Sequence, residues 1–250
     1  ILPIVLLGQI SYISASSSIR ETAETTSLET AREITKYLNK SMTNIEAISR
    51  QISEDKDLQR YVAYVDEQYT SAILESRDRL NQTLNTLKIR NQEIEEIAIL
   101  LGNNRSVITH NSSIEKNALE NLQGDPLLNK ALENERNMLW VGEHAMLDKL
   151  LSNPSSYDMS LVRPIKGAGS SQARGFIVID IKDQLITDAL KGVNLGSGSE
   201  LHLISPDNRG IAYGMDATVG ELRNITGTQD PITSLDFFMN IMDSEGEAGA

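Results

Sequence analysis

Residues 19–65 read IRETAETTSLETAREITKYLNKSMTNIEAISRQISEDKDLQRYVAYV, without a single proline or glycine. Apolar side chains recur there at steps of mostly three or four residues, at Leu28, Ala31, Ile34, Leu38, Met42, Ile45, Ile48, Ile52 and Leu58. Such steps place them along one face of a helix. A helix of this length reaches about 65 Å at 1.5 Å per residue, beyond the usual globular helix. The stretch therefore predicts a long amphipathic helix, the spine, which other elements must support.

The composition limits the classes of protein and of partner. A chain of 250 residues can form one large domain or two small ones with a buried core. The net charge of −12 argues against a nucleic-acid partner, because phosphate binding needs a basic surface. The absence of cysteine excludes disulfides, thiolate nucleophiles and cysteine-based zinc sites.

The segment before the spine is uncharged and strongly apolar as far as Ile13. This apolar part is too short to cross a bilayer of about 30 Å by itself. Two interpretations remain open: the outer end of a truncated transmembrane helix, or the remnant of a signal peptide with a cleavage-like SASS at 14–17. We favour the membrane helix, because the helical pattern continues into the spine without a break.

After the spine the pattern predicts one more helix and then strands. Ile73, Leu80, Leu84 and Leu87 form the stripe of a helix that returns antiparallel along the spine. From Ile94 the period falls towards two, and turn residues at 102–105 separate strands expected at 94–101 and 106–109, a β-hairpin.

Further elements are expected along the rest of the chain. Strands are predicted at 138–141, 159–165 and 175–181, with Pro164 placing the second of them at an edge or a bulge. A helix starts at Asp125-Pro126, and another spans 183–190. A second strand–turn–strand covers 201–205 and 211–213, and a helical pattern at 234–242 follows.

Four motifs in this order carry a resemblance to a known family. They are WVGEH at 140–144 with Asp148 after it, SLVRPI at 160–165, GFIVIDIKDQLI at 175–186, and PDNRG at 206–210. With the preceding helices they resemble the extracellular double Cache sensor domain, which is built from PAS-like modules and occurs in bacterial chemoreceptors and sensor histidine kinases.

The resemblance implies an α+β fold: a long N-terminal helix packed on a PAS-like antiparallel β-sheet module, with a second, truncated PAS-like module. The expected divisions are a truncated transmembrane end at 1–18, the spine and returning helix at 19–92, a membrane-distal Cache module at 93–192, and an incomplete membrane-proximal Cache module at 193–250. The segment would then lie outside the cytoplasm at the cell membrane.

A PAS-like sheet closed by loops forms a pocket for a small molecule. Our candidate ligand-binding residues are Trp140, His144, Asp148, Tyr157, Ser160, Arg163 and Asp180.

Each candidate has a structural alternative. Trp140 either stacks on a ligand or fills the core. Arg163 either clamps a carboxylate or faces outward, and Asp180 either binds an ammonium, caps the next helix or pairs with Arg163. Tyr157 is a lid or plain surface, and Ser160 donates one hydrogen bond or is plain surface.

No metal or other cofactor is expected. His144 and Asp148 have the i, i+4 spacing of metal ligands on a helix, but no third ligand is evident. The amino-acid-binding members of the family have an arginine two residues before the tryptophan, where this chain has Met138. This departure leaves the ligand class open, with a small acid or amine as candidates.

The chain carries no catalytic motif, so we expect no enzyme. The resemblance implies the sensor domain of a methyl-accepting chemotaxis protein, a homodimer that is anchored through the N-terminal segment and signals through the spine. One alternative is the sensor domain of a membrane histidine kinase. Another, from a different class, is a helical-stalk adhesion or scaffold domain without a ligand.

Overall fold

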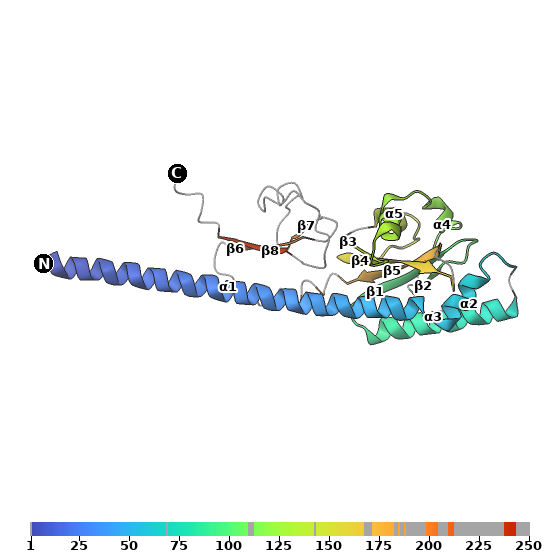
Figure 1. Ribbon diagram of the computed structural model, residues 1–250, viewed down its shortest axis with the longest axis horizontal. Coiled ribbons are helices and arrows are strands. Elements are labelled where there is room, and N and C mark those ends of the chain that lie inside the picture. Colours follow the sequence, from blue (N-terminus) through green and yellow to red (C-terminus); the bar gives the residue numbers. More distant parts are fainter. Residues whose placement is uncertain are drawn as a thin grey trace.

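The computed structural model describes residues 2–68, 70–109, 113–142, 144–167, 172–182, 185, 188, 199–204, 210–212 and 238–243. Within them, three helices precede the first strand: α1 (Leu2–Ser53), α2 (Lys56–Ala63) and α3 (Ser71–Arg90). The α1 helix extends far beyond the globular part of the molecule, as Figure 1 shows.

The predicted spine is broken near its end. Asp55 has an extended backbone, and its side chain accepts hydrogen bonds from the backbone N–H groups of Asp57 and Leu58 at 2.9 and 3.0 Å. It therefore caps a new helix, α2, instead of continuing α1. The expectation of one unbroken helix through Val65 is wrong at this point, because the apolar stripe resumes after the cap and conceals the break.

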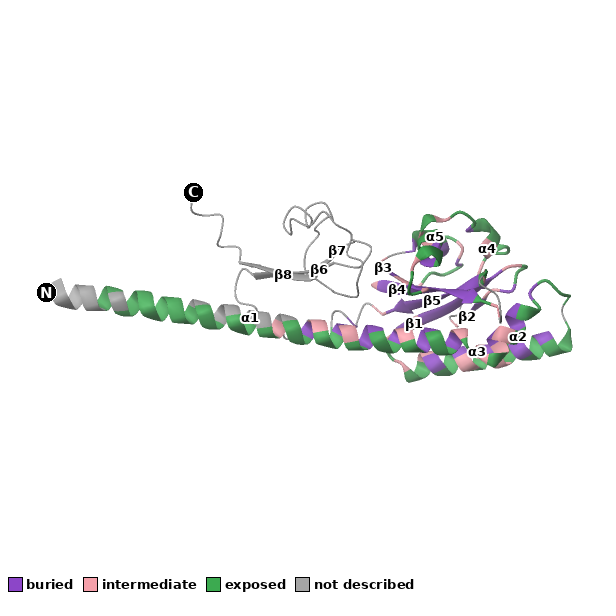
Figure 2. Cartoon of the chain, viewed as in Figure 1, coloured by how far each residue is buried: buried purple, intermediate pink, exposed green. Residues whose placement is uncertain are grey.

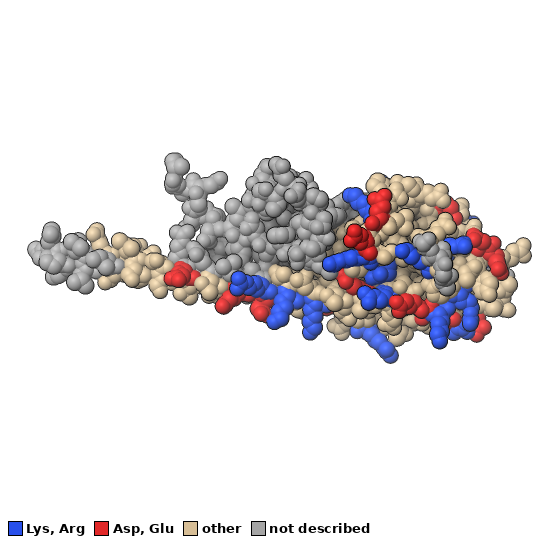
Figure 3. All heavy atoms as spheres, viewed as in Figure 1, with Lys and Arg blue, Asp and Glu red and all other residues tan. Residues whose placement is uncertain are grey.

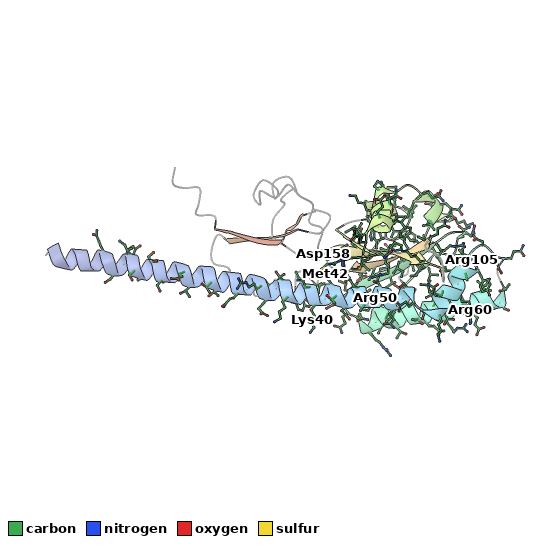
Figure 4. All side chains as sticks on the ribbon, in the orientation of Figure 1. Lys40, Met42, Arg50, Arg60, Arg105 and Asp158 are labelled. Atoms are coloured by element: carbon green, nitrogen blue, oxygen red, sulfur yellow. The ribbon has the colours of Figure 1, made fainter. Side chains whose placement is uncertain are left out.

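The buried stripe of α1 lies in its C-terminal part, from Ile34 to Ile52 (Figure 2). Met42 is buried there, whereas Lys40, two residues earlier, is exposed (Figure 4). Further towards the N-terminus, Tyr12, Ile13 and Ile19 are exposed. No described helix is both long enough and apolar enough to cross a membrane.

The returning helix is confirmed as α3. Thr70 caps it, and it runs back beside the C-terminal part of α1 (Figure 1). It buries the four residues of the predicted stripe, Ile73, Leu80, Leu84 and Leu87.

The described strands of the first module form an antiparallel sheet in the order β2-β1-β5-β4-β3. They are β1 (Ile94–Leu101), β2 (Val107–Ile108), β3 (Leu139–Val141), β4 (Met159–Lys166) and β5 (Ala173–Ile181). The hairpin and the three later strands are thus confirmed. Pro164 lies in an inner strand, but β3 pairs with β4 only from Ser160 to Val162, so β4 has a single neighbour where the proline stands.

The sheet separates two apolar cores. On one face, Leu161 and Ile179 pack with the buried stripes of the helices α1, α2 and α3. On the other, the outer face, Val162 and Val178 pack under a layer that includes α4 (Ala118–Asn121), α5 (Pro126–Glu133) and α6 (Ala145–Asp148). Asp125 caps α5, as its Asp-Pro sequence predicted.

A polar clamp joins the β1–β2 turn to the α2–α3 connection; it comprises Asp66, Glu67, Asn103, Arg105 and Arg174. Asn103 Nδ2 and Arg174 Nη1 donate to the Asp66 carboxylate at 3.0 and 2.9 Å. Arg105 is buried, donates to the Glu67 carbonyl, and lies 5.7 Å from the centre of the Tyr61 ring on α2. Figure 4 shows Arg105 at the end of the module where α2 lies.

A second antiparallel sheet has the order β7-β6-β8 within the described residues, from β6 (Ser199–Ile204), β7 (Gly210–Ala212) and β8 (Phe238–Asp243). It confirms the second strand pair, and β8 contacts α1. The helix expected at 234–242 is wrong from Phe238 on, where the chain pairs with β6. The steps of three between its apolar residues indicated a helix, and pairing with β6 overrides that local pattern. Most of the helix expected at 183–190 lies outside the described residues.

Candidate functional site

The sheet divides the seven candidate residues between its two faces. Trp140 and Arg163 lie on the face towards α1. The other five, His144, Asp148, Tyr157, Ser160 and Asp180, belong to one hydrogen-bonded network on the outer face. Arg163 therefore does not pair with Asp180, because the two side chains lie on opposite faces of the sheet.

Trp140 and Arg163 fasten the sheet to α1. The Trp140 indole donates to Glu46 Oε1 at 3.0 Å, and Arg163 Nε donates to Ser49 Oγ at 2.8 Å. Glu46 and Ser49 are three residues apart and so share one face of the helix. Burial lowers the pKa of Arg163 from its ordinary value, and the nearby Arg50 charge lowers it further. The carboxylates of Glu46 and Glu54 raise the pKa, but they offset this decrease only partly. The Arg163 charge is thus held in the core without an ion pair among the described residues.

The outer-face network is centred on Asp180. Its Oδ1 accepts from His144 Nε2 at 2.7 Å and from Ser160 Oγ at 2.7 Å. Ser160 and Asp180 are direct partners across β4 and β5, and all three side chains are buried. Strand register thus provides the carboxylate with one hydroxyl donor, and the segment after β3 adds the imidazole.

Tyr157 and Asp148 hold the other side of the imidazole. The Tyr157 ring stacks on His144 at 4.3 Å between ring centres, and its hydroxyl donates to Asp148 Oδ2 at 2.8 Å. The same hydroxyl accepts from the His144 backbone N–H at 3.0 Å. Asp148 Oδ1 and the Tyr157 hydroxyl each lie 3.0 Å from His144 Nδ1, and of the two only the hydroxyl has hydrogen-bond geometry. Both ring nitrogens therefore face a carboxylate, the environment of a protonated imidazole.

The electrostatics favour the imidazolium form. Burial on its own would lower the pKa of His144, but Asp180 and Asp148 outweigh it and raise the pKa to about 10. Burial, with the nearby Asp148 carboxylate, also raises the pKa of Tyr157 above its ordinary value. At neutral pH the network thus contains a cation between two anions and a neutral phenol.

Glu96 is a site residue that the sequence analysis missed. It lies on β1 directly opposite Asp180, it is 1% exposed, and neither of its carboxylate oxygens has a hydrogen-bond partner within the described residues. Burial and the Asp180 charge raise its pKa to about 7, while Lys88 and His144 oppose the rise. The sequence did contain a signal: a charged residue within the strand IEEIAILL, two residues before Ala98 and four before Leu100. On a strand these three side chains point to the same face, and Ala98 and Leu100 are buried.

A cavity of about 200 Å³ lies next to this network on the outer face. Most of its lining is apolar and includes Leu100, Leu122, Leu128, Leu147, Val162 and Val178. His144 contributes the buried polar group of the wall, and Asp125 lines it from the start of α5. A concave apolar site with one or two polar groups is the usual form of a small-molecule pocket.

A second cavity, about 440 Å³ in volume, lies between α1 and the C-terminal end of α3. Its lining is mainly polar and includes Arg90, Glu93 and Lys182. Several of these lining groups already form hydrogen bonds with one another or with α1. For example, Glu93 Oε1 accepts a hydrogen bond from Ser41 Oγ of α1 at 2.9 Å. We therefore take the cavity beside His144 as the candidate site.

The described residues contain no group of three or more side chains that could hold a metal ion. Positive and negative side chains of the described residues are interspersed over the face that Figure 3 shows.

Comparison with known proteins supports the fold. No protein-family model matches the chain, and no curated protein sequence does. Among solved structures, the ligand-binding domain of the Pseudomonas aeruginosa amino acid chemoreceptor PctB, in complex with L-Gln, is similar over 87% of this chain and 89% of its own, with a TM-score of 0.55 at 10% identity. The extracellular domain of a protein described as a histidine kinase is similar over 79% of this chain and 72% of its own, with a TM-score of 0.52 at 14% identity.

A domain of a Vibrio parahaemolyticus protein assigned to the sensory box/GGDEF family is similar over 91% of this chain and 97% of its own, with a TM-score of 0.55 at 12% identity. At such low identity the likeness is one of fold. It confirms the expected PAS-like sensor-domain fold, which chemoreceptor and histidine kinase sensor domains share.

Proposed function

We propose that this chain is the extracytoplasmic ligand-sensing domain of a transmembrane chemoreceptor, and that a small molecule binds in the cavity beside His144. The observation that carries the proposal is the position of this cavity, directly against a buried polar network on a sensor-domain sheet. Buried charged networks are costly to maintain in a core, so their presence at a cavity wall favours a role in recognition.

The sensor domain of a histidine kinase is the second candidate. The likeness to the extracellular domain of such a protein favours it as much as the likeness to a chemoreceptor favours the first. Both proposals place the ligand in the same cavity, and they differ only in the output that the bound ligand controls.

Short connections link the cavity to α1. Trp140 on β3 donates to Glu46 of α1, and His144, four residues later, borders the cavity. A ligand that prefers one position of His144 would bias β3, and β3 would bias α1. The signal is then a shift between two populations, and its size is limited by the difference in the ligand's affinity for them.

We also propose an arrangement of the chain within such a receptor. The exposed apolar residues Tyr12, Ile13 and Ile19 of α1 suit a homodimer joined along this helix, with the N-terminal segment at the membrane. The sheet β7-β6-β8 suits a second, membrane-proximal module within 193–250.

The test is a thermal-shift and calorimetric screen of small molecules against the chain and two matched variants. Ala145 is an exposed residue of α6 that lines the cavity, so Ala145→Phe should fill part of it without disturbing the core. Ala72 is an exposed alanine of α3 outside the lining, so Ala72→Phe is the control. A ligand that binds the chain and Ala72→Phe but not Ala145→Phe supports the proposal. A ligand that binds all three equally overturns the site.

A further inference from the structure

The carboxylate best placed to bind a ligand cation is already occupied by a residue of this chain. Asp180 is 3% exposed, and its Oδ1 accepts both from His144 Nε2 and from Ser160 Oγ at 2.7 Å. The imidazole lies between this carboxylate and Asp148, with the Tyr157 ring stacked against it. His144 thus stands where the ammonium of an amine ligand would have to stand.

The rest of the cavity wall provides no second buried anion for an ammonium, because Asp125 is half-exposed. Asp125 is the other charged residue of the lining, and its Oδ1 already accepts from the backbone N–H groups of Leu127 and Leu128 as the cap of α5. An ammonium in the cavity would therefore lose its hydration and meet the His144 cation.

An anionic ligand is equally disfavoured. Both ring nitrogens of His144 already face carboxylates, so the imidazolium has no free N–H for a ligand carboxylate. Asp148, Asp180 and the unpartnered Glu96 surround this single cation. A further negative charge would be repelled by the Asp148 and Asp180 carboxylates and would gain no hydrogen bond from the imidazole.

We infer that the cavity binds a small, uncharged and largely apolar molecule, and that His144 excludes amines by acting as an internal cation on Asp180. The inference rests on the proposed function, whose site it adopts. A volume of about 200 Å³ suits a ligand of one aromatic ring, since an apolar cavity of about 150 Å³ holds benzene. Seven aliphatic residues of the lining supply the apolar contacts.

Three probes of one shape separate the charge classes: benzyl alcohol, benzylamine and benzoate. We expect benzyl alcohol to raise the melting temperature of the chain and of Ala72→Phe, but not that of Ala145→Phe. Benzylamine and benzoate should bind the chain at least about tenfold more weakly than benzyl alcohol, because each carries an uncompensated charge. Benzylamine binding as tightly as benzyl alcohol, and lost in Asp180→Asn, would overturn the inference.

His144→Ala tests the occupant of Asp180 directly. The substitution empties the space beside the carboxylate, so imidazole and benzylamine should each gain about tenfold or more in affinity. The double variant His144→Ala with Asp180→Asn should lose that gain. If His144→Ala does not fold, His144→Gln removes the charge while it keeps a donor, and it should still relax the rejection of benzylamine. The absence of any gain in both His144 variants would overturn the inference.

The two proposals fail in different ways. A wild-type chain that binds an amine at Asp180 would leave the ligand-sensing function in place and refute the ligand class. A screen without any ligand sensitive to Ala145→Phe would refute the function, and the His144→Ala measurement would still decide what occupies Asp180.

Discussion

Glu96 should lower the stability of the folded domain above neutral pH. It is buried opposite Asp180 with both oxygens unpartnered among the described residues. Burial and that charge raise its pKa from 4.5 to about 7. The unfolded chain therefore releases this proton near pH 4.5 and the folded chain near pH 7, so the stability contributed by Glu96 declines as pH rises through this window.

The size of the loss follows from the same interval. At about 1.36 kcal/mol per pH unit, the charged carboxylate destabilises the folded state by about 3 kcal/mol above pH 7. Glu96→Gln keeps the shape and removes the charge. The variant should match the wild type at about pH 4 and exceed its free energy of unfolding by about 3 kcal/mol at about pH 8.

Urea unfolding at several pH values measures this difference. Trp140 is the single tryptophan and is buried between the sheet and α1, so its fluorescence reports on unfolding of this module. Glu95→Gln is the matched control, because the neighbouring Glu95 is only half-buried and its replacement should change stability by less than about 0.5 kcal/mol at any pH. A constant difference between Glu96→Gln and the wild type across the range would refute the reasoning.

Three further predictions concern the sheet and its attachment to α1. Trp140→Phe should destabilise the chain, and a double-mutant cycle with Glu46→Ala should give a coupling free energy of about 0.5–1.5 kcal/mol for the indole hydrogen bond; a coupling near zero would contradict it. Arg163→Met should leave the free energy of unfolding within about 1 kcal/mol of the wild type, because the arginine is a buried cation whose replacement by an apolar side chain of similar length removes a desolvation cost. Gly175→Ala should cost more than about 2 kcal/mol in urea unfolding, since a Cβ there would collide with the backbone of β1; a smaller loss would mean that the strands can move apart.

Local patterns were enough to predict much of the fold. The stripe of α3 and the hairpin of β1 and β2 each depend on residues close together in sequence. The end of α1 was missed because Asp55 caps a new helix inside a continuing apolar stripe. For β8, Phe238–Asp243, the apolar spacing indicated a helix, and only pairing with β6, more than 30 residues away, selects the strand.

The two-sided arrangement of the candidate site was not accessible from the sequence. All of β4 except Lys166 is buried, so no polar alternation reveals which residues face α1. Register decides it: Ser160 lies opposite Asp180, and Arg163 lies opposite Ile177. Arg163 and Asp180 are therefore on opposite faces, although both interrupt apolar strands. Glu96 was missed for a related reason, because its neighbour Asp180 is 84 residues away and only strand pairing brings them together.

The polar clamp at the far end of the module has a mechanical consequence. It ties the α2–α3 connection to the β1–β2 turn, so these two segments move together, and a rotation of the module would turn the packed part of α1 with it. The part of α1 that precedes its buried stripe, residues 2–33, is a lever of about 48 Å. A rotation of the module by about one degree moves the Leu2 end by about 0.8 Å, from the same rise per residue. In the proposed sensor, a small rotation beside the cavity would thus become a larger displacement at the N-terminal end of the helix.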